Sequence, residues 1–508
     1  MTAPDPAEAT ATAEPQIGVR ADGDPPEAAV ETPPAETAVF SDDPGELLQL
    51  DDADASAEWA DDGRQATALT WVDPAAVAAG STARGFDEPL DASGIGILRG
   101  ARLRPAIASP RVLVPIGVLV ALAASYAGTT LLWPLHEVAP TAAPVEFSVT
   151  AAPVASVVWP AQGSAAVGVG GIGLTASSPD AASIASITKV VSALMVLDRM
   201  PLAPGEQGPA FSFTRADSQN YWSYRRSDQS ALDVPVGGTL TEYQMLQGTL
   251  LGSANNYIDR LASEIWGSDR EFAAAAAIWL RDRGLSDITV VTPSGFSEAN
   301  TATPEALLRL GEMAMKNPVF AEIVGTASVE LPGAGTVVNT NGMLADPGVV
   351  GIKTGTLVGW NLLTAKDITV DDTTVKLYAA VLNQGDDEQR LAATRSLFAE
   401  VEAALAAQDA AVPEGTVVGQ VQTVWGEEID IVTDADTDVL LWNGATATST
   451  PEFTLGDARD EGTTVGTLST TGPLNAATTE LTLASDIEGP SFWWRLTHPF
   501  ELFGIDAD

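Results

Sequence analysis

The sequence feature that most constrains the fold is one long stretch without a charged side chain, from Val112 to Trp133. A helix of this length, with a rise of about 1.5 Å per residue, crosses the hydrocarbon core of a bilayer. Four arginines lie shortly before the stretch, and the next Lys or Arg after it is Lys189. Because Lys and Arg collect on the cytoplasmic side of a membrane helix, we predict a single-pass plasma-membrane protein with a cytoplasmic N-terminus.

Two other interpretations of residues 112–133 are weaker. A cleaved signal peptide starts with a short basic leader, whereas here the whole of residues 1–111 precedes the apolar stretch. A buried core helix rarely has flanks in which the basic residues all lie on one side. We therefore expect residues 112–133 to form a transmembrane helix, and the chain beyond them to lie in the cell envelope.

The segments on either side of this helix have compositions that disfavour folding. Residues 1–98 are rich in Ala, Pro, Asp and Glu, and such a segment buries too little apolar surface to offset the entropy of ordering it. We predict a disordered acidic cytoplasmic tail there, and an extended linker rich in Ala, Pro and Val over residues 134–156. The formal net charge of −43 argues against nucleic acid as a partner.

A candidate catalytic pair opens the apolar run 190–197, which has no Gly or Pro and therefore predicts a buried helix. Ser186 and Lys189 are spaced i and i+3, so on a helix they share one face and can form a hydrogen bond. Burial disfavours the charged form of a lysine, and a neutral amine can accept the proton of a serine hydroxyl. We therefore interpret Ser186 as a nucleophile and Lys189 as its base.

Other residue types that commonly build hydrolytic sites are scarce. The chain has no cysteine and only two histidines, His136 and His498. A Cys nucleophile, a Ser-His-Asp triad in the central region and a His/Cys zinc cluster are therefore difficult to assemble, and we expect no metal and no cofactor. Every basic residue before Lys189 is an arginine, which keeps its proton. A lysine in an apolar helix thus favours a base, although Ser-x-x-Lys alone also occurs by chance.

Two further motifs follow along the chain. Ser253 and Asn255 stand in a short turn between two expected helices, where Ser and Asn are also ordinary helix caps. A predicted strand over residues 349–356 precedes an antiparallel hairpin over residues 361–382. That strand carries the second motif, Lys353, Thr354, Gly355 and Thr356.

Three aromatic residues, Tyr221, Trp222 and Tyr224, lie in the polar and turn-rich stretch 201–238. Aromatic side chains in such a stretch either line a cleft or cover the core. We expect these three to cover the core.

The motifs together resemble those of the penicillin-binding protein and serine β-lactamase superfamily, and most closely those of the D-alanyl-D-alanine carboxypeptidases of low molecular mass. Asn256 is a departure, because that family commonly has an acidic residue there. The resemblance rests on their common order in the chain: Ser186-x-x-Lys189, Ser253-x-Asn255 and Lys353-Thr354-Gly355.

The resemblance implies an α/β (α+β) fold for residues 157–408, with an antiparallel sheet flanked by helices. It also implies a serine peptidase that removes the terminal D-alanine from peptidoglycan stem peptides through an acyl-enzyme on Ser186, with Lys189 as the base. Ser253 and Asn255 would then move the proton and orient the substrate amide.

Substrate binding, on the same resemblance, involves the third motif. Lys353 and Thr354 would hold the terminal carboxylate by charge and hydrogen bond. The backbone N–H groups of Ser186 and Thr356 would form the oxyanion hole. Gly355 would allow the substrate to approach the strand edge closely.

β-Lactams are expected to act as covalent inhibitors that leave Ser186 slowly, because the chain lacks the Glu-x-x-Leu-Asn motif with which class A β-lactamases deacylate. Two alternatives remain open at this point. One is a β-lactamase or D,D-endopeptidase of the same superfamily. The other is a catalytically silent scaffold of the cell envelope.

The C-terminal region has a different pattern. Residues 413–486 are rich in Thr, Val and Gly in short alternating runs, which predict a small all-β domain in the form of a β-sandwich. Residues 487–508 form an aromatic tail that could contact lipid or pack against the β domain.

Overall fold

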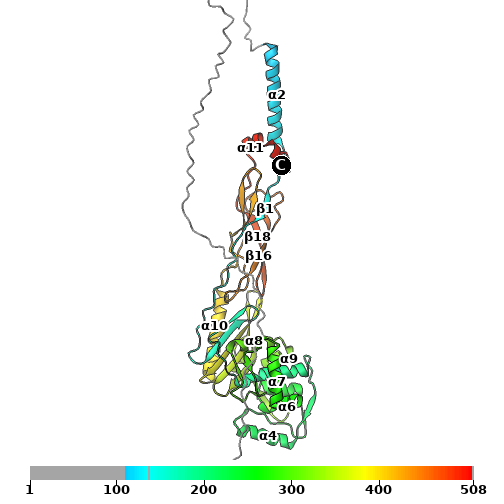
Figure 1. The fold of residues 1–508 in the computed structure, drawn as a ribbon, viewed down its shortest axis with the longest axis vertical. Coiled ribbons are helices and arrows are strands. Elements are labelled where there is room, and N and C mark those ends of the chain that lie inside the picture. The colour runs from blue at the N-terminus through cyan, green and yellow to red at the C-terminus, as the bar shows by residue number, and fades with distance from the viewer. Residues whose placement is uncertain (1–108, 136–137, 506–508) are drawn as a thin grey trace, which may run out of the picture. The chain divides into compact units, whose positions relative to one another are not determined.

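The computed structural model describes residues 109–135 and 138–505. By its internal contacts the chain divides into two units, Met1–Arg102 and Leu103–Asp508. The predicted acidic tail over residues 1–98 lies outside the described residues, as does His136. Figure 1 shows the helices and strands of the second unit.

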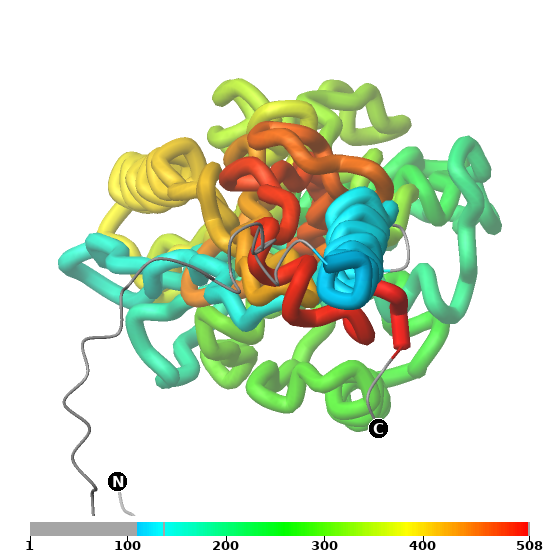
Figure 2. The backbone as a smooth tube through the Cα atoms, turned by 90° about the horizontal axis from the view of Figure 1, so that it is seen from above, coloured from blue at the N-terminus to red at the C-terminus, as the bar shows by residue number. Residues whose placement is uncertain are grey.

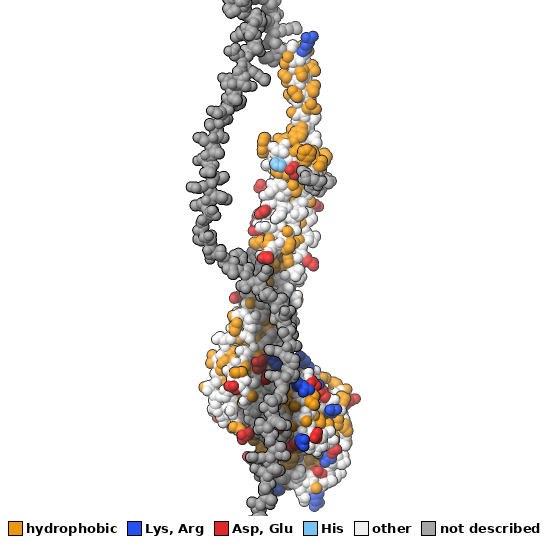
Figure 3. All heavy atoms as spheres, viewed as in Figure 1, with side chains coloured by type: hydrophobic (Ala, Val, Ile, Leu, Met, Phe, Trp, Pro, Cys, Tyr) orange, Lys and Arg blue, Asp and Glu red, His pale blue; other side chains and the backbone are white. Residues whose placement is uncertain are grey.

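Helix α2 (Pro110–Leu132) covers the predicted transmembrane segment. It begins with a proline at its first position, where the missing N–H costs no intrahelical hydrogen bond. Its side chains are mostly exposed and apolar, as the orange spheres along it in Figure 3 show. By length and composition α2 is suited to cross a membrane.

An antiparallel sheet of five strands forms the centre of the larger folded region, in the order β11-β12-β13-β2-β3. The strands are β2 (Ser164–Val169), β3 (Gly173–Ala176), β11 (Val349–Thr356), β12 (Trp360–Val370) and β13 (Thr373–Gln384). β13 pairs with β2, so the sheet joins the two ends of this region. The predicted hairpin is confirmed as the pair β12–β13.

Successive side chains of β13 alternate between two apolar clusters, one on each face of the sheet. Leu377 and Val381 pack with helix α10 (Asp387–Ala406), the yellow coil in Figure 2. Ala380 and Leu382 instead belong to the cluster that contains the remaining helices. Both faces of the sheet are therefore covered and shielded from water.

The helices of the second face surround α3 (Thr188–Arg199), in which every residue from 188 to 197 is buried. This confirms the buried helix that the apolar run predicts. Its neighbours are α5 (Glu242–Leu250), α6 (Asn255–Trp266), α7 (Asp269–Arg281) and α8 (Pro304–Ala314). Helix α9 (Pro318–Gly325) packs against α5 and β11.

The boundaries of these helices follow from local sequence. Thr241 and Gln244 form a capping box at the start of α5, each bonding the backbone N–H of the other. Thr303 caps α8, whose first residue is a proline. Gly267 ends α6 with a φ of 79°, a conformation that glycine adopts without steric cost.

Short elements connect the helices and the sheet: β4 (Ala182–Ser183), η4 (Ala185–Ile187), β5 (Ala210–Ser212), α4 (Arg215–Arg226), β6 (Thr239–Thr241), β7 (Ile288–Thr289), β8 (Thr301–Ala302), β9 (Ser328–Leu331), β10 (Gly335–Val338) and η5 (Gly342–Ala345). Helix α4 carries the three aromatic residues Tyr221, Trp222 and Tyr224, and none of its residues is buried. The expectation that they cover the core is therefore wrong. Tyr224 instead lines a polar cavity.

The C-terminal domain is all-β, as predicted, but it is not a sandwich of two separate sheets. It has one antiparallel sheet in the order β1-β14-β15-β18-β17-β16. Its two edge strands approach each other, and Gly419 on β14 lies against both Phe453 and Ala143. The strands are β14 (Val417–Gln422), β15 (Glu428–Thr433), β16 (Thr448–Phe453), β17 (Thr464–Thr471) and β18 (Ala476–Leu483).

The first strand of this sheet, β1 (Thr141–Pro144), lies within the predicted linker over residues 134–156. It pairs with β14 from Thr141 opposite Gln422 to Pro144 opposite Gly419. Residues 141–144 of the predicted extended linker are therefore a paired strand and not a free spacer, because the edge of a sheet accepts an Ala- and Pro-containing strand.

The aromatic tail contains two short helices, α11 (Phe492–Thr497) and α12 (Pro499–Leu502). Trp494 packs edge-on against Trp425 at 6.3 Å, so one part of the tail contacts the β domain. Phe492 and Trp493 are exposed.

Candidate active site

The candidate nucleophile Ser186 lies in the single turn η4 just before α3. The preceding residue, Ala185, has a φ of 48°, which costs a non-glycine residue about 1–3 kcal/mol and is held by its surroundings. Gly295 makes this turn possible, because a Cβ there would stand 2.1 Å from the carbonyl oxygen of Ala185. Ser186 is half-buried and therefore remains accessible to a substrate.

Lys189 is fully buried in the first turn of α3, and its Nζ lies close to three oxygens. These are Ser186 Oγ at 2.8 Å, Asn255 Oδ1 at 2.6 Å and Ser294 O at 2.6 Å. The amide and carbonyl oxygens can only accept, so the two N–H groups of a neutral amine satisfy them. The lone pair then faces the hydroxyl of Ser186, which is the arrangement that a base requires.

The surroundings of Lys189 favour this neutral form. Burial lowers the pKa of Lys189 from 10.5 to about 7, against the opposing charge of Asp259. At neutral pH a large fraction of the amine is therefore uncharged and able to accept a proton.

Ser253 and Asn255 lie in the turn between α5 and α6, and both side chains are buried. Ser253 has a φ of 58°, a second strained position in the same region. Asn255 accepts a hydrogen bond from Lys189 and donates one from Nδ2 to Gln229 Oε1 at 2.8 Å. The structure thus brings the Ser-x-Asn turn directly to the amine.

The third motif lies on β11, which packs against η4. Lys353 is buried, and its Nζ lies 3.3 Å from Thr354 Oγ1, which in turn lies 2.7 Å from Thr340 Oγ1. Burial lowers the pKa of Lys353, and the nearby charges of Lys189 and Arg390 lower it further. A bound anion beside Lys353 would oppose these effects and favour its charged form.

Gly355 and Thr356 complete this strand. A Cβ on Gly355 would stand 2.6 Å from Ile184 O and 3.3 Å from Ile187 N. The absence of a side chain at Gly355 thus lets β11 lie against the turn that holds Ser186. This packing is a second reason for a glycine there, besides the predicted approach of substrate. Thr356, at the end of the strand, is exposed.

Two arginines near the site have different surroundings. Arg390 is buried on α10, donates from Nη1 to Asn361 O at 3.1 Å, and stacks on the ring of Trp360. Arg395 instead donates to Asp346 at 2.6 Å and is half-exposed. Arg390 therefore supports β11 from behind the third motif.

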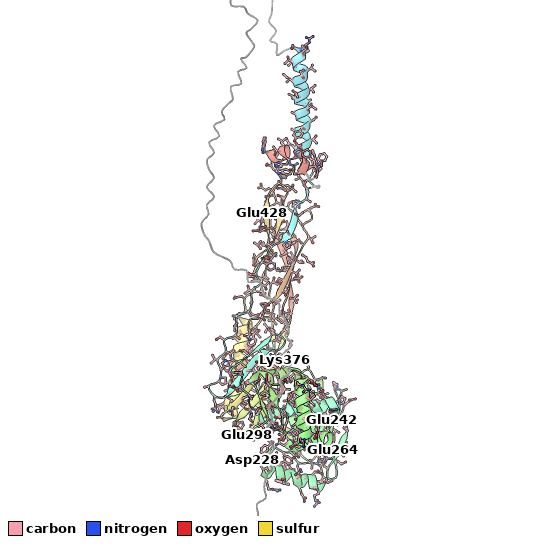
Figure 4. The ribbon with its side chains drawn as sticks, in the orientation of Figure 1. Asp228, Glu242, Glu264, Glu298, Lys376 and Glu428 are labelled. Carbon is pink, nitrogen blue, oxygen red and sulfur yellow. The ribbon has the colours of Figure 1, made fainter. Side chains whose placement is uncertain are left out.

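Sequence reasoning missed three neighbours of these residues: Gln229, Asp259 and Ser294. Gln229 follows α4 and Ser294 follows β7, so each arrives from a loop with no motif of its own. Figure 4 labels Asp228 and Glu298, which lie in these same two loops. A sequence signal existed for Asp259, which follows Asn255 by four residues and so shares its face of α6.

Residues 171–384 match the family model described as D-alanyl-D-alanine carboxypeptidase. The D-alanyl-D-alanine carboxypeptidase DacB2 of Mycobacterium tuberculosis is 32% identical over 180 residues, which cover 34% of this chain and 57% of that protein. The chain therefore aligns with little more than half the length of this relative.

Solved structures with a similar course of chain include penicillin-binding protein 5 from Haemophilus influenzae. It is 16% identical, with a TM-score of 0.45, over 66% of this chain and 100% of that one. The Streptomyces K15 DD-transpeptidase is 22% identical, with a TM-score of 0.42, and the match covers 49% of this chain and 100% of that one. On the family-model match and the curated relative, the region that holds Ser186, Lys189 and Lys353 is similar to the D-alanyl-D-alanine carboxypeptidase family.

Proposed function

We propose that this protein is a membrane-anchored serine D-alanyl-D-alanine carboxypeptidase, which removes the terminal D-alanine of peptidoglycan stem peptides. The observation that carries the proposal is the contact between Lys189 Nζ and Ser186 Oγ at 2.8 Å, inside a site where burial favours the neutral amine. The family match of residues 171–384 supports the choice of substrate class.

The first half of the reaction is acyl transfer to the enzyme. Ser186 Oγ attacks the carbonyl carbon of the penultimate D-alanine while Lys189 takes its proton. The C–N bond then breaks, and the proton passes to the amine of the departing D-alanine, with Ser253 next to its path. Asn255, held by Gln229 and Lys189, orients the substrate amide.

Charge complementarity supports a substrate that ends in a carboxylate. Lys353 and Thr354 present an ammonium and a hydroxyl on β11, and the terminal carboxylate of a peptide can accept from both. The backbone N–H groups of Ser186 and Thr356 stabilise the tetrahedral oxyanion in this proposal. The loss of one such donor typically lowers kcat by about a hundredfold or more.

The cell-envelope location is part of the same proposal. Helix α2 is long and apolar enough to cross a membrane, and the arginines that precede it favour a cytoplasmic N-terminus. The catalytic region then lies on the outer side, where peptidoglycan is found.

Covalent labelling of the full-length protein by a fluorescent penicillin tests the proposed nucleophile. We expect the wild type to carry a stable label and Ser186→Ala to carry none. Ser178→Ala is a matched control, because Ser178 is a serine that is half-buried like Ser186 but bonds Asp180. An unlabelled wild type, or equal labelling of Ser186→Ala, contradicts the proposed acyl-enzyme.

Release of D-alanine from a diacyl-D-Ala-D-Ala peptide then separates the enzyme classes. A carboxypeptidase releases D-alanine with the wild type and not with Ser186→Ala. Labelling without D-alanine release favours a β-lactamase or D,D-endopeptidase, and a folded protein that does neither favours a scaffold.

A further inference from the structure

The half-buried carboxylate of Asp259, near the candidate base, has no role in the steps described above. Asp259 Oδ2 accepts a hydrogen bond from the Tyr224 hydroxyl at 3.0 Å. Asp259 Oδ1 is buried and has no hydrogen-bond partner among the described residues. With Gln229 and Ser294, Asp259 lines a polar cavity of about 350 Å³. A buried carboxylate with one unpaired oxygen is costly unless a cation lies near it.

Lys189 is that cation when it is protonated. The carbonyl oxygen of Ser294 accepts from Lys189 Nζ at 2.6 Å, and Ser294 and Asp259 line the same cavity. Ser294 thus connects the two groups through one residue. Burial raises the pKa of Asp259, and the charge of Lys189 opposes this shift. In the same way, the charge of Asp259 opposes the lowering of the pKa of Lys189.

The charged groups around this pair come from several elements. The charge of Asp259 on α6 acts on Lys189 on α3, and the charge of Lys189 also acts on Lys353 on β11. Asp259 faces Tyr224 on α4 and Asp269 on α7 as well. Asp259 is therefore the carboxylate whose charge favours the ammonium form of Lys189, whereas Lys353 disfavours that form.

We propose that Asp259 is a positioning residue that acts as the counter-ion of Lys189 during acyl transfer, an inference that rests on the proposed function. When the Ser186 Oγ–C bond forms, the proton of Ser186 converts the buried amine into an ammonium. The negative charge of Asp259 stabilises that ammonium. When the C–N bond breaks, the proton goes to the leaving amine and Lys189 becomes neutral again, while Asp259 neither gains nor loses a proton.

The pH dependence of acylation of the full-length chain by a fluorescent penicillin tests this role. Asp259→Asn keeps the size of the side chain and an oxygen that accepts from Tyr224, but it removes the charge. Without that charge the pKa of Lys189 falls, so the acidic limb of the rate profile moves to lower pH by about one unit. A weaker base also lowers the plateau rate by about tenfold.

Asp269→Asn is the matched control. Asp269 is exposed at the start of α7, and its charge acts on Asp259 and Tyr224. We expect the acidic limb of the Asp269→Asn rate profile to stay at the pH of the wild type, because the charge of Asp259 remains. An Asp259→Asn profile that coincides with the wild type, or an equal shift in Asp269→Asn, overturns the proposal.

A second variant gives an answer if Asp259→Asn does not fold. Tyr224→Phe removes the hydrogen bond that lowers the pKa of Asp259, so less of the carboxylate is charged near its pKa. A smaller shift of the limb in the same direction supports the proposal, and no shift contradicts it. An unlabelled wild type refutes the proposed function itself, whereas a labelled wild type with unshifted variants refutes only the role of Asp259.

Discussion

The two large sheets of the described residues differ in how their faces are covered. In the five-stranded sheet, β13 is buried at every position from Leu377 to Leu382, because helices pack on both faces. In the six-stranded sheet, β17 buries Val465 and Leu468 but exposes Thr467 and Ser469 between and after them. Such alternation is typical of an antiparallel sheet with one face toward solvent.

This difference in coverage explains why the candidate catalytic lysines lie at the five-stranded sheet and not in the β domain. The doubly covered sheet holds Lys353 in a strand that is shielded from water, and η4, the turn before α3 and Lys189, packs against the same strand. Burial is the largest cause of the lowered pKa of both lysines. The buried polar residues of the β domain include Thr470 and Thr482, whose hydroxyls do not titrate in the neutral range. A covered sheet is thus a prerequisite for a lysine base.

The replacement that most sharply tests this contrast is Lys189→Arg. Arginine keeps its proton in a protein, so the site loses its base, and we expect acylation by penicillin to fall by about a thousandfold. Lys376→Arg is the matched control on the same sheet. Lys376 is labelled in Figure 4 and pairs with Asp367 at the more exposed end of β13. Stopped-flow acylation measures both, and a rate for Lys189→Arg within tenfold of the wild type would argue against a lysine base.

A smaller effect is expected when one glycine in each sheet is replaced by alanine. In Gly355→Ala the new Cβ meets backbone atoms of Ile184 and Ile187, so the turn that holds Ser186 must move. We expect about a hundredfold slower acylation, since a shift of about 1 Å is enough. In Gly419→Ala the Cβ meets the ring of Phe453 at 2.4 Å. That variant should lose about 1–3 kcal/mol of stability in thermal unfolding, and its acylation rate should stay unchanged. Equal acylation rates in the two variants would contradict the idea that only the five-stranded sheet supports the site.

The smallest effect is the pH dependence of the wild type. Burial lowers the pKa of Lys189 to about 7, and only the neutral amine accepts a proton. The acylation rate therefore falls as the pH drops through about 7, by about tenfold for each further pH unit. Rates in a series of buffers of constant ionic strength check this. A rate that is flat down to about pH 5 would mean that Lys189 is not the group that titrates.

Much of the fold was predictable because local sequence decides it. The apolar run after Lys189 has no helix breaker, and the hairpin β12–β13 has its turn at two acidic residues, Asp371 and Asp372. Local pattern is sufficient in these places. The three motifs, in contrast, lie far apart in the chain, and their convergence was expected only from the resemblance.

The remainder depends on tertiary contacts that no local pattern encodes. Ser294 reaches Lys189 across 105 positions, and Gln229 reaches Asn255 across 26. Both come from irregular loops, whose course depends on what they pack against. Strand β1 contains Pro144 and two alanines, a composition that suggests a linker until a partner edge is present. The expectation that the aromatic residues of α4 cover the core was wrong for a related reason, since apolar character alone does not identify what a side chain faces.

The pairing of β1 with β14 links the membrane-proximal chain to a domain that begins almost three hundred positions later in the sequence. A protease that cuts between residues 145 and 156 would separate α2 from the catalytic region covalently. The two fragments would still be joined by the ladder from Thr141 to Pro144. Separation of α2 from the catalytic region thus requires this ladder to open as well as a peptide bond to break.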